Sequence, residues 1–384
     1  MIYIFINQAT RYLFIDIINC FAEKRQNVVL YTGEIREGKT KINKNIKTKL
    51  LIKYNNSTAF KRLFTWLIFT FIVFFKILFM KKRNTTLILV STPPFLTFLG
   101  IFFNKFFGVP YYLIIYDIYP DVLVSFKVLK QKSFLIKSWN KLNVILYKRA
   151  TKVFTISSFM SNRIKEQGCN EKKIYTVSNW VDTSFIQPIK KYDNYFLKEL
   201  GLENKFIIIY SGNMGATHDI ETLIIVAESL KNISDIHFLI IGDGIKKKKI
   251  EQIIEDKALR NITSLPLQPS EVLPYSLASG DLAYVTLDIG AENSSVPSKL
   301  FYMLAAGCGI ISVSSKKSEL GFLTKHYNFG RIFAPGEINE IKNFILECKS
   351  NKEKLSEYKN NARIASFDFS PKNALQFYKQ IIDV

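Results

Sequence analysis

The sequence has 384 residues, of which 48% are hydrophobic, so it excludes a disordered chain and predicts two domains with separate cores. A formal net charge of +21 favours an anionic partner: an acidic membrane, a phosphate-bearing substrate or nucleic acid. The four cysteines are too scattered for a metal site or a disulfide framework, and we expect reduced thiols.

Short apolar runs alternate with longer helical patterns along the chain, which predicts an α/β protein with parallel sheets. The first residues lack the basic region of a signal peptide and are expected to form a buried strand. In the first half, strands are predicted near 3–6, 28–31, 87–91, 111–115, 153–156 and 174–177. In the second half, they are predicted near 206–210, 237–241, 282–286 and 309–313.

An apolar run at 63–80 is nearly as long as a membrane-spanning helix. Lys76 interrupts it, both flanks are basic, and the strands on either side are expected in one sheet, so spanning is disfavoured. Thr65, Lys76 and Arg83 would share one side of a helix that is otherwise apolar, a pattern typical of the membrane interface. The alternative is a very apolar core helix. The aromatic stretch 94–107 either widens this surface or is buried.

The domain pattern restarts in the second half of the sequence. We predict an N-terminal domain over 1–187, a C-terminal domain over 188–365, and a final helix over 366–384 that packs back towards the N-terminal domain. The stretch 186–204 has little periodicity and is interpreted as the linker. Doubly wound sheets bind ligands at the carboxyl ends of their strands, so a site is expected in the cleft between the domains.

Glycines follow two predicted strands of the second half. Gly212 and Gly215 lie between a strand and a helix, and Gly242 and Gly244 end the next strand. Such turns let backbone N–H groups approach a phosphate, although each could be only a tight turn. In the first half, by contrast, residues 7–11 contain no glycine, which argues against a dinucleotide-binding oxidoreductase.

The segment 296–307 predicts a short helix that Ser298 caps and Gly307 ends. Lys299 falls in the first turn, where a cation is unfavourable because it opposes the helix dipole. A diphosphate bound between the lysine side chain and the N-terminus of the helix would explain why a lysine stands there.

Several of these segments resemble the donor domain of glycosyltransferase family 4, which has the GT-B architecture of two Rossmann-like, doubly wound domains facing a cleft. The resemblance lies in the order and spacing of residues 210–215, 241–244, 279–281 and 296–307. Residues 91–94, 116–121 and 178–182 resemble acceptor-domain signatures of the branch that builds bacterial surface polysaccharides, which includes fucosamine-type transferases.

The resemblance implies a retaining hexosyl- or N-acetylhexosaminyl-type transferase that uses a nucleotide sugar, expected to be a UDP-sugar, and no metal or other cofactor. It implies catalytic roles for Lys299 and His218 at the diphosphate and for Asp117 at the acceptor. From the residues alone, Asp117 could instead cap the turn before Pro120, and His218 could cap the next helix. The implied donor-binding residues are Gly212, Asn213, Gly215, Gly242, Gly244, Val296, Pro297, Ser298, Leu300 and Tyr302.

The implied acceptor is a polyprenyl-diphosphate-linked saccharide, for O-antigen or capsule synthesis. We expect the protein to lie peripherally on the cytoplasmic face of the inner membrane, against its anionic surface.

One feature departs from the family pattern. Many members carry two glutamates eight residues apart, where this sequence has Ser294 and Tyr302, and Glu292 lies two residues out of register. No basic residue lies between Gly215 and Lys231 either, so Lys299 becomes the main cationic candidate. A catalytically inactive scaffold of polysaccharide assembly is therefore one alternative. A basic nucleic-acid-binding protein is another, although no RNA-binding signature interleaves aromatic residues with the lysine clusters, and nucleic acid is not the expected partner.

Overall fold

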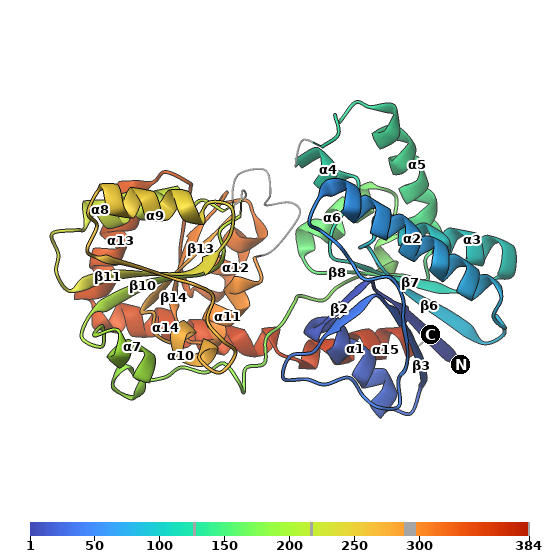
Figure 1. Cartoon of the computed structure of the whole chain (residues 1–384), viewed down its shortest axis with the longest axis horizontal. Coiled ribbons are helices and arrows are strands. Elements are labelled where there is room, and N and C mark those ends of the chain that lie inside the picture. Colours follow the sequence, from blue (N-terminus) through green and yellow to red (C-terminus); the bar gives the residue numbers. More distant parts are fainter. Residues whose placement is uncertain (126–127, 216–217, 288–296, 383–384) are drawn as a thin grey trace. The chain divides into compact units, whose positions relative to one another are not determined.

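A computed structural model describes residues 1–125, 128–215, 218–287 and 297–382. The chain forms two compact units (Figure 1). The first comprises Met1–Ser178 and Pro371–Val384, and the second comprises Asn179–Ser370. Each unit has a parallel β-sheet with helices on both faces, which confirms the predicted α/β class.

The first unit contains a seven-stranded parallel sheet with the order β5-β3-β1-β6-β7-β8-β9. A separate pair is formed by β2 (Ala9–Arg11) and β4 (Glu34–Arg36). The strand order reverses beside β1, because β3 lies on one side of it and β6 on the other. The strands of the large sheet are β1 (Ile2–Ile6), β3 (Asn27–Thr32), β5 (Lys47–Leu50), β6 (Thr85–Val90), β7 (Tyr111–Ile115), β8 (Lys152–Thr155) and β9 (Ile174–Thr176).

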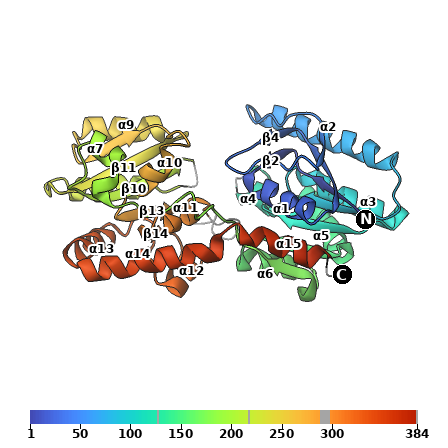
Figure 2. The same cartoon turned by 90° about the horizontal axis from the view of Figure 1, so that it is seen from below.

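Alternating side chains of β1 pack against helices on opposite faces of this sheet. Tyr3 and Phe5 contact Phe21 of α1 (Tyr12–Glu23), which lies beside the final helix α15 (Lys372–Ile382) (Figure 2). Ile4 and Ile6 belong to the core on the other face. The helices of that face are α2 (Ala59–Leu78), α3 (Phe98–Phe107), α5 (Phe134–Arg149) and α6 (Ser158–Glu166). The short helices η1 (Pro94–Thr97), α4 (Asp121–Ser125) and η2 (Glu171–Lys173) complete the unit.

The second unit contains a six-stranded sheet with the order β12-β11-β10-β13-β14-β15. Counted within the unit, this is the order 3-2-1-4-5-6 of doubly wound nucleotide-binding sheets. The reversal lies beside β10, which pairs with β11 on one side and β13 on the other. The strands are β10 (Phe206–Asn213), β11 (Ile236–Asp243), β12 (Ile262–Leu265), β13 (Leu282–Thr286), β14 (Gly309–Val313) and β15 (Gly330–Phe333).

Two apolar clusters cover the faces of this second sheet. One packs against α8 (Glu221–Ser229), α9 (Lys247–Asp256) and α13 (Ile338–Ser350). The other packs against α7 (Tyr195–Glu199), α10 (Leu273–Leu277), α11 (Lys299–Ala305), α12 (Glu319–Tyr327) and α14 (Lys352–Ser366). The short helix η3 (Lys191–Asp193) precedes α7, and η4 (Phe367–Phe369) follows α14.

The prediction of a linker over 186–204 is wrong, because these residues are part of the second unit. Ile186 and Leu197 are fully buried in the apolar cluster that contains α11. Lys191 forms an ion pair with the buried carboxylate of Asp281, and Arg363 donates a hydrogen bond to the carbonyl oxygen of Ile186 (3.1 Å). The compact units divide at 178 and 370, whereas the predicted boundaries lay at 187 and 365.

The apolar run of the first unit forms α2, whose N-terminus is capped by the side chain of Thr58. The prediction that Thr65, Lys76 and Arg83 share a polar side is wrong. Thr65 is buried on the side that faces the sheet, and Arg83 lies beyond the end of the helix. Within the described part of the chain, no helix has the length and apolar character needed to span a bilayer.

Candidate functional site

Each unit has a cavity where its strand order reverses. The first-unit cavity has a volume of about 350 Å³ and is lined by residues at or after the carboxyl ends of β1, β6 and β7. The second-unit cavity has a volume of about 370 Å³ and is lined by the end of β10 and the start of α11. Doubly wound sheets bind their ligands at such positions, so both cavities are candidate sites.

The second-unit cavity brings together many of the residues that the sequence predicted for the donor site. These are Gly212, Asn213, His218, Pro297, Ser298, Lys299 and Tyr302. Ser211, Leu267, Leu273, Leu277 and Met303 also line it and had been assigned no role. The apolar members of this second group come from loops and helices far apart in the sequence, and only the folded unit reveals their proximity.

Lys299 is held at the cavity by the aromatic ring of Tyr210. Its Nζ donates a hydrogen bond to the Tyr210 hydroxyl (2.8 Å) and lies 4.1 Å from the centre of that ring. The hydroxyl in turn donates to the carbonyl oxygen of Asn213 (2.6 Å). Burial lowers the pKa of Lys299 from 10.5 to about 7. The ammonium group is therefore held without full hydration, and an anion would restore its charge.

Gly212 borders the lysine at the end of β10. Its φ of +136° is a backbone conformation that other residues rarely adopt, which explains why glycine stands at this position. A Cβ added there would lie in ordinary contact with Lys299, at 3.5 Å from Cε and 3.7 Å from Nζ. Ser298 precedes the lysine at the N-cap position of α11, but its side chain makes no capping hydrogen bond, so the predicted cap is wrong.

His218 lines the same cavity with a neutral ring. Burial and, after it, the positive charges of Lys299 and Lys246 lower its pKa from 6.5 to about 4. Its Nδ1 is buried without a hydrogen-bond partner among the described residues. Asp219 begins the next helix by accepting hydrogen bonds from Thr222 N (3.0 Å) and Thr222 Oγ1 (2.6 Å). The His218 side chain therefore belongs to the cavity, while Asp219 performs the capping.

The remaining predicted donor residues lie apart from the cavity lining. The side chain of Leu300 is fully buried in the core. A Cβ at Gly242 would lie 2.0 Å from the carbonyl oxygen of Gly212, and one at Gly244 would lie 2.7 Å from that of Met214. These glycines thus let the ends of β10 and β11 approach each other. A Cβ at Gly215 would crowd the Asn213 side chain at 2.8 Å. Val296 lies outside the described residues, as do Glu292 and Ser294.

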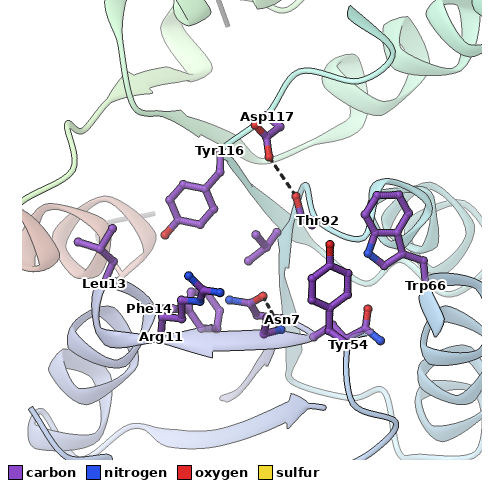
Figure 3. A pocket seen from close by; sticks show the side chains of 12 residues that line it. Asn7, Arg11, Leu13, Phe14, Tyr54, Trp66, Thr92, Tyr116 and Asp117 are labelled. Atoms are coloured by element: carbon purple, nitrogen blue, oxygen red, sulfur yellow. Dashed lines mark hydrogen bonds between the residues drawn. The ribbon is translucent and has the colours of Figure 1, made fainter. Parts of the chain in front are cut away.

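Asp117 lies in the first-unit cavity, after β7 (Figure 3). The turn that carries it is held by Ser91, whose hydroxyl oxygen accepts hydrogen bonds from the backbone N–H groups of Tyr116 (3.0 Å) and Asp117 (3.1 Å). Its carboxylate accepts a hydrogen bond from Thr92 (3.3 Å). Burial raises the pKa of Asp117. The carboxylate is therefore a stronger base than an exposed aspartate, and it faces a cavity.

Several further residues line the first-unit cavity without a predicted role at a site, among them Gln8, Arg11, Tyr54 and Trp66. Gln8 lies between β1 and β2, and Arg11 ends β2, in the segment whose lack of glycine argued against dinucleotide binding. Trp66 comes from α2 and Tyr54 from the segment before it.

Within the described ranges, no group of three or more His, Cys, Asp or Glu side chains could hold a metal ion.

Part of the chain matches a known protein family. Residues 193–365 match the family described as "Glycosyl transferases group 1". Over 177 residues, the chain is 33% identical to WcaI of Escherichia coli, named as a colanic acid biosynthesis glycosyl transferase; the match covers 46% of this chain but only 43% of that relative. It is 27% identical over 271 residues to WbjE of Pseudomonas aeruginosa, named as a glycosyltransferase, with 70% and 67% of the two chains covered.

The fold of the whole chain also has solved counterparts. HepE from Anabaena, determined in complex with UDP, superposes with a TM-score of 0.73 at 14% identity, and the match covers 100% of both chains. At this identity the likeness shows the fold, and it confirms the predicted GT-B architecture of two Rossmann-like units.

Proposed function

Because residues 193–365 form a glycosyl transferases group 1 domain in a chain with the GT-B fold, we propose that the protein transfers a sugar from a nucleotide sugar to a saccharide of a bacterial surface polysaccharide. The observation that carries the proposal is Lys299, a desolvated lysine at a cavity to which no carboxylate of the described residues is paired. A diphosphate supplies the charge and the acceptor oxygens that such a group binds. The polysaccharide role named for the relative WcaI supports the product class.

The donor is proposed to be a UDP-sugar bound in the second-unit cavity. The UDP complex of HepE supports this choice of nucleotide. In this chain, Gly212, Ser298 and Lys299 would surround the diphosphate, and the apolar side chains of Leu267, Leu273 and Met303 would pack against the remainder of the nucleotide.

The chemical step breaks the bond between the anomeric carbon and the diphosphate and forms one to an acceptor hydroxyl, whose proton must leave. Lys299 would stabilise the charge that develops on the departing diphosphate. The neutral ring of His218 would add a hydrogen bond. Asp117 would orient the acceptor hydroxyl and accept its proton, helped by its raised pKa. Retention of configuration, the hexosyl or N-acetylhexosaminyl class and independence from metals are proposed from the family resemblance.

An exposed aromatic surface on the first unit supports a membrane-bound acceptor. Phe71 of α2 is 64% exposed, and Phe79 just beyond the helix is 83% exposed. We call the exposed apolar set the aromatic ridge: Phe60, Phe64, Leu67, Phe71, Phe75 and Phe79, with Phe106 and Phe107 of the neighbouring α3. Figure 1 shows α2 and α3 beside each other, where Phe74 contacts Phe102 at 5.0 Å.

The ridge has the composition of a surface that enters a bilayer interface. The spacing of three or four residues places its α2 members on one side of the helix, opposite the buried Phe69 and Val73. Lys61, Lys81 and Lys105 lie close to it in the chain and would meet acidic headgroups. We therefore propose peripheral binding to the cytoplasmic face of the inner membrane, and a polyprenyl-diphosphate-linked saccharide as the acceptor.

The test is an assay of the full chain on anionic vesicles that contain lipid-linked saccharides, with a panel of radiolabelled nucleotide sugars. We expect transfer from a UDP-sugar, unaffected by EDTA and reduced about 10²- to 10³-fold in Lys299→Met. Transfer by this variant at the wild-type rate would overturn the role of Lys299. Nucleotide binding without turnover on any acceptor would favour an inactive scaffold, the candidate suggested by Tyr302 in place of a glutamate.

A further inference from the structure

The connection between β10 and α8 places His218 at the second-unit cavity. The backbone of this residue is held on both sides. Its N–H donates a hydrogen bond to the carbonyl oxygen of Gly215 (3.2 Å), and its carbonyl oxygen accepts one from the N–H of Ile220 (3.0 Å). The same carbonyl oxygen accepts a second hydrogen bond from Nζ of Lys246 (2.8 Å), 28 residues further along the chain. A cation from the next connection of the sheet therefore fixes the histidine.

Lys246 is itself held by Glu221, the first residue of α8. Its Nζ lies 2.9 Å from Oε2 of this glutamate, and the two side chains are only 20% and 37% exposed. The backbone N–H of Lys246 donates to the carbonyl oxygen of Met214 (3.1 Å), directly after β10. An ammonium group that meets a carboxylate and a carbonyl oxygen at once has a defined position. We call Lys246 and Glu221 the clasp.

The charges around the imidazole of His218 favour its neutral form. Burial is the main cause of its lowered pKa, and the positive charges of Lys299 and Lys246 follow. The carboxylates next to it in the chain are engaged elsewhere: Asp219 accepts hydrogen bonds at the start of α8, and Glu221 accepts one from Lys246. A neutral imidazole carries one N–H donor, so its use at an anion depends on where the ring is held.

A second ion pair joins the same two helices at their other ends. Glu228 near the end of α8 pairs with Lys257, which directly follows α9. Either pair could hold α8 and α9 together. Only the pair at the start of the helices also bonds to the residue that lines the second-unit cavity. This difference indicates a role for the clasp beyond the packing of the helices.

We propose that Lys246 and Glu221 are positioning residues that hold the neutral imidazole of His218 at the diphosphate of the donor. Lys246 acts through the backbone carbonyl group of His218, and Glu221 acts through Lys246. The inference rests on the proposed function, in which His218 donates a hydrogen bond to the diphosphate.

The test is calorimetric titration of the full chain with UDP at pH 7. Lys246→Met and His218→Ala should each weaken binding about tenfold, the effect of losing one hydrogen bond to a charged group. The variant with both changes should bind no more weakly than His218→Ala, because positioning has no effect once the positioned ring is absent. Lys246→Arg keeps the charge and the donors and should stay within about threefold of the wild type. The matched control is Lys257→Met, which should bind as the wild type does.

Glu221→Gln separates positioning from a general effect of charge. This variant keeps the size of the side chain but removes a negative charge. A long-range charge effect would therefore strengthen the binding of the anion, whereas a loosened Lys246 should weaken it about threefold. Because Glu221 is partly exposed and the change is conservative, circular dichroism and the melting temperature should stay close to those of the wild type.

A second measurement needs no nucleotide. The chain has 3 histidines, so their ring signals can be followed separately by NMR as pH is varied. The pKa of His218 should rise in Lys246→Met from about 4 towards 6.5, because a nearby positive charge is lost and the ring is less firmly buried. His237, whose pKa is also lowered to about 4 by burial, should keep its value and is the internal reference.

The outcomes separate this inference from the proposed function. Tighter or unchanged UDP binding in Glu221→Gln would overturn the inference. So would additive effects of Lys246→Met and His218→Ala, or an unchanged pKa of His218 in Lys246→Met, even if transfer of a sugar were established. A raised pKa with non-additive UDP binding, but no transfer from any nucleotide sugar, would support the clasp and overturn the proposed function.

Discussion

Binding of the nucleotide sugar should weaken as pH rises above neutrality, because Lys299 must be protonated to hold the diphosphate. In the free protein its pKa is about 7, lowered by burial from 10.5. The charged form therefore predominates below pH 7 and is lost as pH rises through that value. The groups next to it do not titrate in this range. His218 has a pKa of about 4, and burial raises the pKa of Tyr210.

The size of the effect follows from the protonated fraction. With a pKa of about 7, about one half of the lysine is charged at pH 7 and about one hundredth at pH 9. If the bound diphosphate keeps it charged throughout, the dissociation constant rises about 50-fold over this interval. In Lys299→Met the constant should already be about 10- to 100-fold larger at pH 7, from the loss of a charge-assisted hydrogen bond, and nearly independent of pH.

The measurement is calorimetric titration of the full chain with a UDP-sugar at pH 6, 7, 8 and 9. Its diphosphate keeps a constant charge over this range, and the parallel titration of Lys299→Met corrects for the uracil N–H, which begins to ionise at the top of the range. Lys248→Met, which removes a lysine of α9 outside the cavity lining, should keep the wild-type slope. A flat wild-type profile would refute the argument from the buried lysine. So would a Lys299→Met protein with the wild-type slope.

Four other outcomes follow from the site and from the ridge. Lys299→Met should raise the melting temperature of the nucleotide-free protein by a few degrees at pH 7, measured by scanning calorimetry, because the folded state disfavours the charged lysine; this gain should disappear as pH approaches 10.5. Asp117→Asn should lower kcat about 10²- to 10⁴-fold and leave the affinity for UDP unchanged in titrations. Gly212→Ala should weaken UDP binding, since an alanine rarely adopts the φ of +136° found there and the turn beside Lys299 would have to change its conformation. Serine in place of both Phe64 and Phe71 should reduce sedimentation with anionic vesicles at least about tenfold, while circular dichroism and melting stay as in the wild type, because both side chains are exposed. Unchanged sedimentation would contradict the ridge assignment.

Apart from β9 at one edge of the first sheet, the strands that the sequence revealed lie away from the sheet edges. The runs near 87–91 and 282–286 became β6 and β13, whose side chains are all buried. The strands that escaped prediction are short or lie at sheet edges. β5 has the sequence Lys-Thr-Lys-Leu and is largely exposed, so it carries no apolar signal. The linker prediction over 186–204 was wrong for a similar reason. The buried side chains of this interval are irregularly spaced around short helices, so they show no periodic apolar pattern.

The site was predictable only where its residues are adjacent in the sequence. The turn after β10 and the start of α11 each form a continuous segment, and the structure places both at one cavity. Residue spacing carried no information about which side chain would hold Lys299, since Tyr210 is 89 residues away. It also could not distinguish glycines that border a ligand from those, such as Gly242, that let two strands approach.

The helix α2 joins the two features of the first unit that a membrane-bound acceptor requires. Phe64 and Leu67 belong to the exposed ridge, while Trp66 between them points to the other side of the helix and lines the cavity that contains Asp117. The carbonyl oxygen of Thr65 holds Gln8 in the same wall. A helix that were only a core element would not expose a row of phenylalanines, and one that were only an anchor would not contribute a buried tryptophan to the cavity that contains Asp117. Changes on the exposed side should therefore affect lipid-linked acceptors more than soluble ones, whereas Trp66 should affect both.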